Sequence, residues 1–291
     1  MRRPISNTDI TVGGVCSPVL QAGPSGASEA IVFVHGNPGP KEDWADLLAV
    51  VGQFARAVAP DMPGYGAADK PADFRYTIDG YAEHLAGLVD QLAIERVHLV
   101  LHDFGGPWGL AWGVKHPESF ASATLIGTGA PIDYHWHRYA RIWRTPVLGE
   151  VFQATAMRRG ARILLGRQNP ELPREAIDHI YSGTRSWATK RAVLKLYRAT
   201  PEALLAAPVA ALRALDRPAL VLWPTRDPYL PVEQAERQRQ AFPSARIELL
   251  EGRGHWPFLE DPERVASLVV PFLRDQLSGR DRVHPQPRPT P

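Results

Sequence analysis

Residues 97–109 read VHLVLHDFGGPWG and join an apolar run to an acid and a glycine-rich turn. The apolar run is interrupted only by His98, which is typical of a strand buried on both faces of a sheet. Asp103 follows this strand, and the small residues after Phe104 permit a sharp turn into a helix. Because ligands bind beyond the carboxyl ends of strands in open α/β sheets, we predict that Asp103 lies in a binding cleft.

The same pattern of an apolar run followed by a turn recurs along the chain. The further strands that it predicts lie at residues 29–36, 55–61, 121–128, 218–225 and 245–252. Helical spacing of apolar residues separates the runs, as in residues 78–92. This alternation predicts an α/β fold with a mostly parallel central sheet flanked by helices.

Residues 131–205 depart from this alternation. They contain no strand candidate and are rich in Arg, Trp and Tyr at helical spacing, which indicates a helical cap, or lid, inserted into the fold. We therefore expect the first part of the core at residues 1–130 and the second at residues 206–279. The proline-rich residues 280–291 are expected to form a disordered tail.

Composition limits the class of protein. The chain has 291 residues with a net charge of +2, and Cys16 is its only cysteine, which excludes an intrachain disulfide and a cysteine-based zinc site. Lys and Arg are scattered along the sequence, so we expect no nucleic-acid partner and no membrane insertion. No apolar stretch approaches the roughly 18 residues of a membrane helix, so we expect a cytoplasmic protein. Monomer and homodimer both remain open.

Three further residues follow predicted strands. Asn37 lies in VHGNPGP (34–40), Asp227 in WPTRDPYLP (223–231) and His255 in EGRGHWPFLEDPE (251–263). Each has a simple structural alternative: a plain turn for Asn37, an Asx turn for Asp227 and a packed or surface histidine for His255. The alternative for Asp103 is a helix N-cap. However, Asp103, Asp227 and His255 stand in the order nucleophile, acid, histidine of a hydrolase triad. Three suitable residues that all follow predicted strands are stronger evidence for a triad than one.

The chain resembles the α/β-hydrolase superfamily over nearly its whole length. The motifs HGNP, DMPGYG (61–66), HDFGG, RDP and GHWPFLEDP stand in the order of that family. An aspartate at the nucleophile turn is similar to the epoxide hydrolase and haloalkane dehalogenase branches. Leu101 departs from the pattern because many such turns carry a small residue there, so the turn must accommodate its side chain.

The resemblance implies a mechanism without cofactor or metal. Asp103 would attack an sp³ carbon and become an ester, and His255, oriented by Asp227, would activate the water that hydrolyses this ester. The backbone N–H groups of Asn37 and Phe104 would form the oxyanion hole.

The two branches differ in how the leaving group is stabilised. The resemblance to epoxide hydrolases implies ring-opening tyrosines in the cap: Tyr197 near its end, and Tyr139 or Tyr134 near its start. Asn37 resembles the halide-binding asparagine of dehalogenases. Phe104, however, offers no side-chain N–H where that family usually has Trp. Indole groups that could replace it are those of Trp44, Trp108, Trp136, Trp143 and Trp187.

The leading hypothesis is therefore an epoxide hydrolase that converts an epoxide and water into a vicinal diol. We expect a small apolar substrate in a pocket lined by Pro38, Trp143 and Trp256. The alternatives are a haloalkane dehalogenase with the same triad and a non-catalytic binding protein with this fold.

Overall fold

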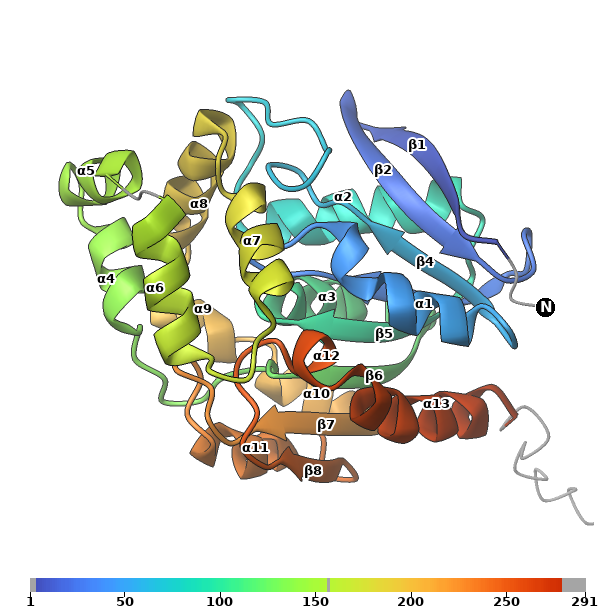
Figure 1. Ribbon diagram of the computed structural model, residues 1–291. Coiled ribbons are helices and arrows are strands. Elements are labelled where there is room, and N and C mark those ends of the chain that lie inside the picture. Colours follow the sequence, from blue (N-terminus) through green and yellow to red (C-terminus); the bar gives the residue numbers. More distant parts are fainter. Residues whose placement is uncertain (1–3, 156–157, 279–291) are drawn as a thin grey trace, which may run out of the picture.

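A single sheet forms the centre of the computed structural model, which describes residues 4–155 and 158–278; within these ranges the sheet has eight strands. The strands are β1 (Ser6–Val12), β2 (Val15–Ala22), β3 (Glu29–Val34), β4 (Arg56–Pro60), β5 (Arg96–His102), β6 (Phe120–Ile126), β7 (Ala219–Pro224) and β8 (Arg246–Leu250). Their order is β1-β2-β4-β3-β5-β6-β7-β8. The first three in this order pair antiparallel and the rest pair parallel. The expected α/β architecture with a mostly parallel sheet is confirmed (Figure 1).

Strands β3 to β8 coincide with the six predicted runs, but the β1–β2 hairpin was not anticipated. Most side chains of β1 are exposed, and its sequence SNTDITV has no apolar run. An edge hairpin of this kind carries little of the hydrophobic signal that marks a doubly buried strand.

The sheet separates two hydrophobic cores. Along β3, Val32 and Val34 face one core, whereas Ile31 and Phe33 face the other. Such alternation explains the continuous apolar run, since both faces of the strand are buried. The first core is covered by α2 (Ile78–Gln91) and α3 (Gly105–Lys115), and the second by α1 (Ala45–Val51) and α13 (Pro262–Ser278).

Helices fill the connection between β6 and β7. Those within residues 131–205 are α4 (Arg138–Arg144), α5 (Leu148–Thr155), α6 (Arg158–Gln168), α7 (Arg174–Gly183), α8 (Trp187–Ala199) and α9 (Glu202–Ala206). The remaining helices are α10 (Val209–Leu215), α11 (Glu233–Arg237) and α12 (Pro257–Glu260), with short 3₁₀ turns at Lys41–Trp44 and Gln238–Gln240. Figure 1 shows α4 to α8 grouped beyond the end of the sheet toward which the arrow of β7 points. Below, "cap" denotes residues 131–205; the predicted tail at residues 280–291 lies outside the described residues.

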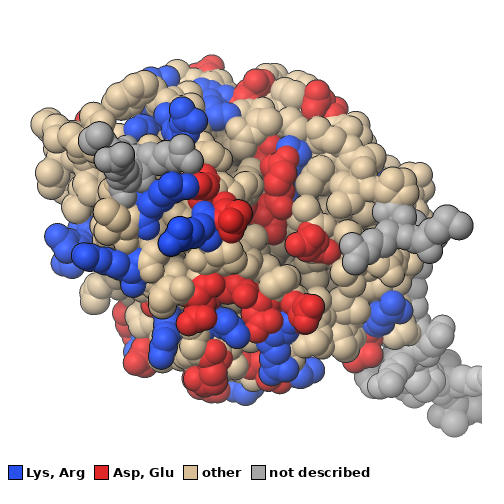
Figure 2. Space-filling model, in the orientation of Figure 1, with Lys and Arg blue, Asp and Glu red and all other residues tan. Residues whose placement is uncertain are grey.

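Charge is less evenly spread than the sequence suggested. Residues 131–205 contain thirteen Lys and Arg against six Asp and Glu, so the basic charge of the chain is concentrated in the cap. Figure 2 shows Lys and Arg side chains gathered on the side of the molecule where the cap helices lie.

Candidate active site

Asp103 lies at a strained turn between β5, which ends at His102, and α3, which begins at Gly105. Its φ of 47° falls in the left-handed region that non-glycine residues rarely adopt, and such conformations cluster at functional sites. The N-cap of α3 is Phe104, and no side chain caps this helix. The carboxylate of Asp103 is therefore not used as a helix cap.

Two glycines make room for this turn. A Cβ on Gly36 would lie 2.3 Å from the Cβ of Asp103, so only glycine allows the aspartate to approach this loop. A Cβ on Gly109 would lie 2.5 Å from a methyl group of Leu101. Gly109, one helical turn into α3, thus supplies the space that the large side chain of Leu101 requires.

The two oxygens of the Asp103 carboxylate face different partners. Oδ1 accepts a hydrogen bond from the backbone N–H of Asn37 at 2.6 Å. Oδ2 lies 3.5 Å from Nε2 of His255. The backbone N–H of Asn37 thus stabilises negative charge at Oδ1, whereas Oδ2 is the oxygen that faces His255. Phe104, the other predicted oxyanion residue, directly follows Asp103 at the start of α3.

Asp227 orients His255 and also shapes its own loop. Its Oδ2 lies 2.7 Å from Nδ1 of His255. Its Oδ1 accepts hydrogen bonds from the backbone N–H groups of Tyr229 at 2.8 Å and Leu230 at 3.0 Å. The Asx turn considered as an alternative is therefore present, but it uses one oxygen and leaves the other for the histidine.

Burial and charge set the protonation of this group. Burial alone would lower the pKa of His255, but the carboxylates of Asp227 and Asp103 raise it to about 10. Burial would likewise raise the pKa of Asp103, but the hydrogen bond and charge of His255 hold it below its ordinary value. The resting site therefore holds an ionised Asp103 beside a protonated His255.

The histidine before Asp103 has a structural environment. His102 donates from Nε2 to the backbone carbonyl of His255 at 2.8 Å, and its ring packs against that of Phe258. Burial lowers the pKa of His102 to about 3, so it is neutral near pH 7. From the cap, Oδ1 of Asn169 accepts a hydrogen bond from the backbone N–H of His255 at 3.0 Å. Core and cap thus both fix the loop that carries His255.

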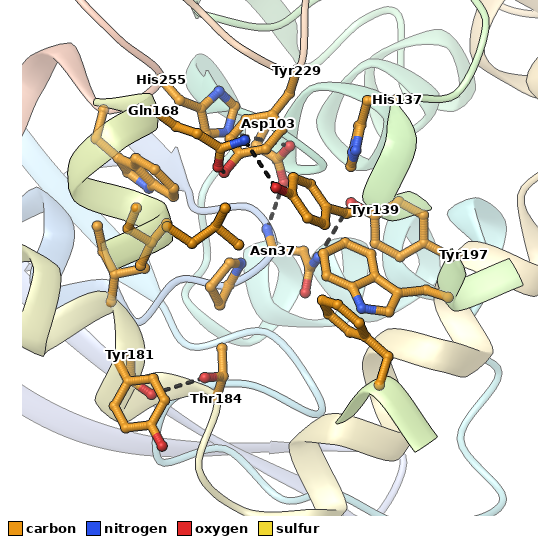
Figure 3. Close-up of a pocket in the computed structure, with 17 residues that line it drawn as sticks. Asn37, Asp103, His137, Tyr139, Gln168, Tyr181, Thr184, Tyr197, Tyr229 and His255 are labelled. Carbon is orange, nitrogen blue, oxygen red and sulfur yellow. Dashed lines mark hydrogen bonds and ion pairs between the residues drawn. The ribbon is translucent and has the colours of Figure 1, made fainter. Parts of the chain in front are cut away.

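A cavity of about 140 Å³ lies above Asp103, between the core and the cap. It is lined by Asn37, Pro38, Asp103, His137, Tyr139, Trp143, Phe152, Leu164, Leu165, Gln168, Ile180, Tyr181, Thr184, Tyr197, Tyr229, His255 and Trp256. Figure 3 shows Tyr181 and Thr184 at the end far from Asp103. Most of the lining is apolar or aromatic, and it includes the predicted pocket residues Pro38, Trp143 and Trp256.

The structure brings two of the three predicted cap tyrosines into this cavity. The hydroxyl of Tyr197 accepts a hydrogen bond from Nδ2 of Asn37 at 3.4 Å. The hydroxyl of Tyr139 accepts one from Nε2 of Gln168 at 3.2 Å (Figure 3). Tyr134 differs, because its hydroxyl donates to the backbone carbonyl of Tyr229 at 3.1 Å and the residue lines a separate small cavity. Tyr134 precedes α4, whereas Tyr139 lies on it.

The indole groups predicted as halide donors lie in different surroundings. Trp143 and Trp256 line the cavity, but their Nε1 atoms are completely buried and have no hydrogen-bond partner. The indole nitrogen of Trp136 donates to the carbonyl of Thr200 at 3.3 Å. Trp44 and Trp108 are fully buried in the core, and Trp187 is exposed and does not line the cavity. Of the five tryptophans considered as halide donors, Trp143 alone lines the cavity, with its Nε1 buried.

The lining residues that were not identified from the sequence include His137, Gln168 and Tyr229. Nδ1 of His137 accepts the backbone N–H of Ala140 at 3.2 Å as the cap of α4, so its Nε2 carries the proton. Burial lowers the pKa of His137 to about 4, so this donor is uncharged. Tyr229 could have been found, since it follows the strand-end residue Asp227 by two positions. Gln168 carries no sequence signal.

Within the part of the chain that the structure describes, no cluster of three or more His, Cys, Asp or Glu side chains is placed to hold a metal ion. None of the described helices is both long and apolar enough to cross a membrane.

The chain belongs to the alpha/beta hydrolase family, whose model matches residues 31–268. It is 29% identical to the 2-hydroxymuconate semialdehyde hydrolase of Pseudomonas sp. (strain CF600), over 86% of this chain and 89% of the relative. It is also 29% identical to the cis-3-alkyl-4-alkyloxetan-2-one decarboxylase of Xanthomonas campestris pv. campestris, over 90% of this chain and 92% of the relative.

Solved structures give the same fold. Epoxide hydrolase A from Mycobacterium thermoresistibile superposes with a TM-score of 0.79 at 21% identity, covering 93% of this chain and 98% of that one. The protein is thus an α/β-hydrolase. The relatives are named for different reactions, so the reaction of this chain has to be argued from its own site.

Proposed function

We propose that this α/β-hydrolase opens epoxides and hydrolyses the resulting ester on Asp103 to release a vicinal diol. One observation carries the proposal. An ionised carboxylate lies at the base of an apolar cavity, and two tyrosine hydroxyls on the cap side, Tyr197 and Tyr139, accept hydrogen bonds from carboxamides. A carboxylate displaces at sp³ carbon, and a hydroxyl that already accepts a hydrogen bond retains its proton to donate.

The first step forms the ester. Oδ2 of Asp103 attacks one ring carbon, the bond from that carbon to the ring oxygen breaks, and the oxygen takes a proton from Tyr197 or Tyr139. The product is a 2-hydroxyalkyl ester of Asp103 and a tyrosinate. Esterification removes the charge of Asp103, one of the two carboxylates that raise the pKa of His255. His255 then loses its proton more readily, and this proton is available to restore the tyrosine hydroxyl.

The second step hydrolyses the ester. Neutral His255, oriented by Asp227, takes a proton from water, and the hydroxide attacks Cγ of Asp103. The backbone N–H of Asn37, which holds Oδ1 in the resting site, stabilises the oxyanion. The intermediate collapses by releasing Oδ2 with the alcohol, and the new carboxylic acid gives its proton to the departing alkoxide. The diol therefore contains one oxygen from Asp103, and the oxygen of water stays in the enzyme.

The lining of the cavity offers no other nucleophile of the acyl-transfer type. Within the described residues that line it there is no serine or cysteine. The hydroxyl of Thr184 donates to the backbone carbonyl of Tyr181 at 2.8 Å, far from the triad. The geometry therefore favours chemistry on the carboxylate of Asp103.

A second candidate substrate is a β-lactone. The relative from Xanthomonas campestris is named for an oxetan-2-one, which is also a strained oxygen ring, and the match covers 90% of this chain. Attack of Asp103 on the alkyl carbon of such a ring would break its bond to the ring oxygen and leave an ester of Asp103 that carries a free carboxylate. Loss of this carboxylate as carbon dioxide, with cleavage of the carbon–oxygen bond to Asp103, would give an alkene and restore the aspartate. Neither step would need the tyrosine protons. Dependence on Tyr197 and Tyr139 therefore separates the two candidates.

A side-by-side assay tests the proposal. Purified protein is incubated with styrene oxide, 1-bromobutane and a cis-3,4-dialkyl oxetan-2-one, and diol, bromide and carbon dioxide are measured. Diol from styrene oxide, without bromide, is the expected result. Bromide without diol would establish the dehalogenase alternative, and carbon dioxide without diol would establish the lactone reaction. A ligand that binds without any product would support the non-catalytic alternative.

A further inference from the structure

Gln168 connects the cap and the core through two hydrogen bonds at the cavity wall. It ends α6, and its Nε2 donates to the hydroxyl of Tyr139 on α4 at 3.2 Å. Its Oε1 accepts from the hydroxyl of Tyr229, in the core loop after β7, at 3.3 Å. All three residues line the cavity above Asp103. Gln168 therefore contacts the site without belonging to the triad.

The chemistry of a carboxamide fixes the direction of both bonds. Its oxygen can only accept and its nitrogen can only donate. Tyr229 thus uses its single hydroxyl proton on Gln168, whereas Tyr139 receives a hydrogen bond and keeps its own proton. Since the ring of Tyr139 is packed among His137, Trp143 and Phe152, the cavity is the open direction for that proton.

Tyr197, on α8 of the cap, has the same arrangement. Nδ2 of Asn37 donates to its hydroxyl, so Tyr197 also keeps its proton. Tyr134 shows the contrasting case, because its proton is used on the backbone carbonyl of Tyr229. Among Tyr134, Tyr139, Tyr197 and Tyr229, the two that accept a hydrogen bond from a carboxamide, Tyr139 and Tyr197, therefore keep their protons available.

We propose that Gln168 is a positioning residue that keeps Tyr139 a proton donor toward the epoxide oxygen. This inference rests on the proposed epoxide chemistry. Gln168 acts through Tyr139 and does not itself touch the reacting atoms. It affects ring opening, which needs the tyrosine proton, and not hydrolysis of the ester, which depends on His255.

The substitution Gln168→Glu tests the direction of the hydrogen bond rather than its presence. The introduced carboxylate has nearly the same shape but can only accept, so Tyr139 would donate to it and lose its proton for the substrate. We expect ring opening of styrene oxide in a single turnover to slow to nearly the rate of Tyr139→Phe, on the order of 10²-fold. Ester hydrolysis should stay within about 2-fold. Lowering the pH should restore ring opening in the variant alone, as the introduced carboxyl group regains a proton to donate.

Two comparisons separate this role from a purely structural one. Gln168→Met removes both hydrogen bonds without adding charge, and it should slow ring opening less than Gln168→Glu because the Tyr139 proton stays free. Adding Gln168→Glu to Tyr139→Phe should cause no further loss. Wild-type ring opening in Gln168→Glu, or an equal loss when Tyr139 is already Phe, would overturn the inference. If the wild type forms no ester with styrene oxide, the proposed function itself fails, and the inference fails with it.

Discussion

The core side and the cap side of the cavity are held by different kinds of contact. On the core side, backbone N–H groups fix the carboxylates: that of Asn37 binds Asp103, and those of Tyr229 and Leu230 bind Asp227. On the cap side, side chains hold side chains, as Gln168 does for Tyr139. The carboxylate of Asp103 is thus positioned by the fold itself, whereas the proposed proton donors depend on single side chains and are easier to alter by substitution.

The largest expected effect is on the core side. In Asp103→Asn, the introduced side chain has nearly the same size and also tolerates the positive φ of this position. It lacks the carboxylate that is the proposed nucleophile. We expect turnover of styrene oxide to fall by on the order of 10⁴-fold or more, with an unchanged thermal unfolding curve. Steady-state kinetics and circular dichroism check this. Retained turnover would exclude the covalent mechanism. It would also mean that the core side of the cavity does not supply the nucleophile.

Substitution of the cap tyrosines should give smaller and separable effects. Tyr197→Phe and Tyr139→Phe should each slow ring opening by on the order of 10²-fold, because each removes a proton donor. Tyr134→Phe is the matched control and should change this rate by less than about 3-fold, since its proton is used on the carbonyl of Tyr229. Rapid-quench measurement of ester formation checks all three. An equal decrease in the rate of ring opening in the three variants would mean that the position of a tyrosine in the cavity does not determine whether it donates the proton.

The smallest effect concerns stability. Burial lowers the pKa of His84, in the core, to about 4 from an ordinary value of 6.5, so the unfolded chain binds this proton first as the pH falls. Stability should therefore fall between pH 6.5 and 4, by about 2 kcal/mol at pH 5 for this one group. His84→Gln should reduce the pH dependence, measured by urea unfolding at pH 7 and 5. The exposed cap residue His135, replaced by Gln, should leave it unchanged. The same pH dependence of stability in the wild type, His84→Gln and His135→Gln would contradict the assignment of this effect to His84.

The difference between the core side and the cap side also explains which site residues could be predicted from the sequence. Asp103, Asp227 and His255 each follow an apolar run, and parallel strands bring their carboxyl ends to one edge of the sheet. Their meeting was therefore predictable without knowing any side-chain contact. In the hairpin β1–β2, most side chains of β1 are exposed and give no apolar run, and the mostly buried β2 was missed because Ser17, Pro18 and Gln21 interrupt its apolar run.

The cap could be predicted only as a helical block. Tyr134 and Tyr139 are five residues apart, and which one faces the cavity depends on where α4 begins and how it packs. Gln168 meets Tyr139 across 29 residues of sequence through helix packing, which no local pattern records. The concentration of basic residues in the cap was also missed, because the sequence analysis considered the net charge of the whole chain.

If Asp103 becomes an ester that His255 hydrolyses, the variant His255→Gln should form this ester and retain it. The variant is mixed with styrene oxide, and the intact protein and its proteolytic peptides are analysed by mass spectrometry. The expected result is a mass increase equal to one styrene oxide, located on the peptide that contains Asp103. No adduct on a variant that binds styrene oxide, or an adduct on another residue, would exclude this mechanism.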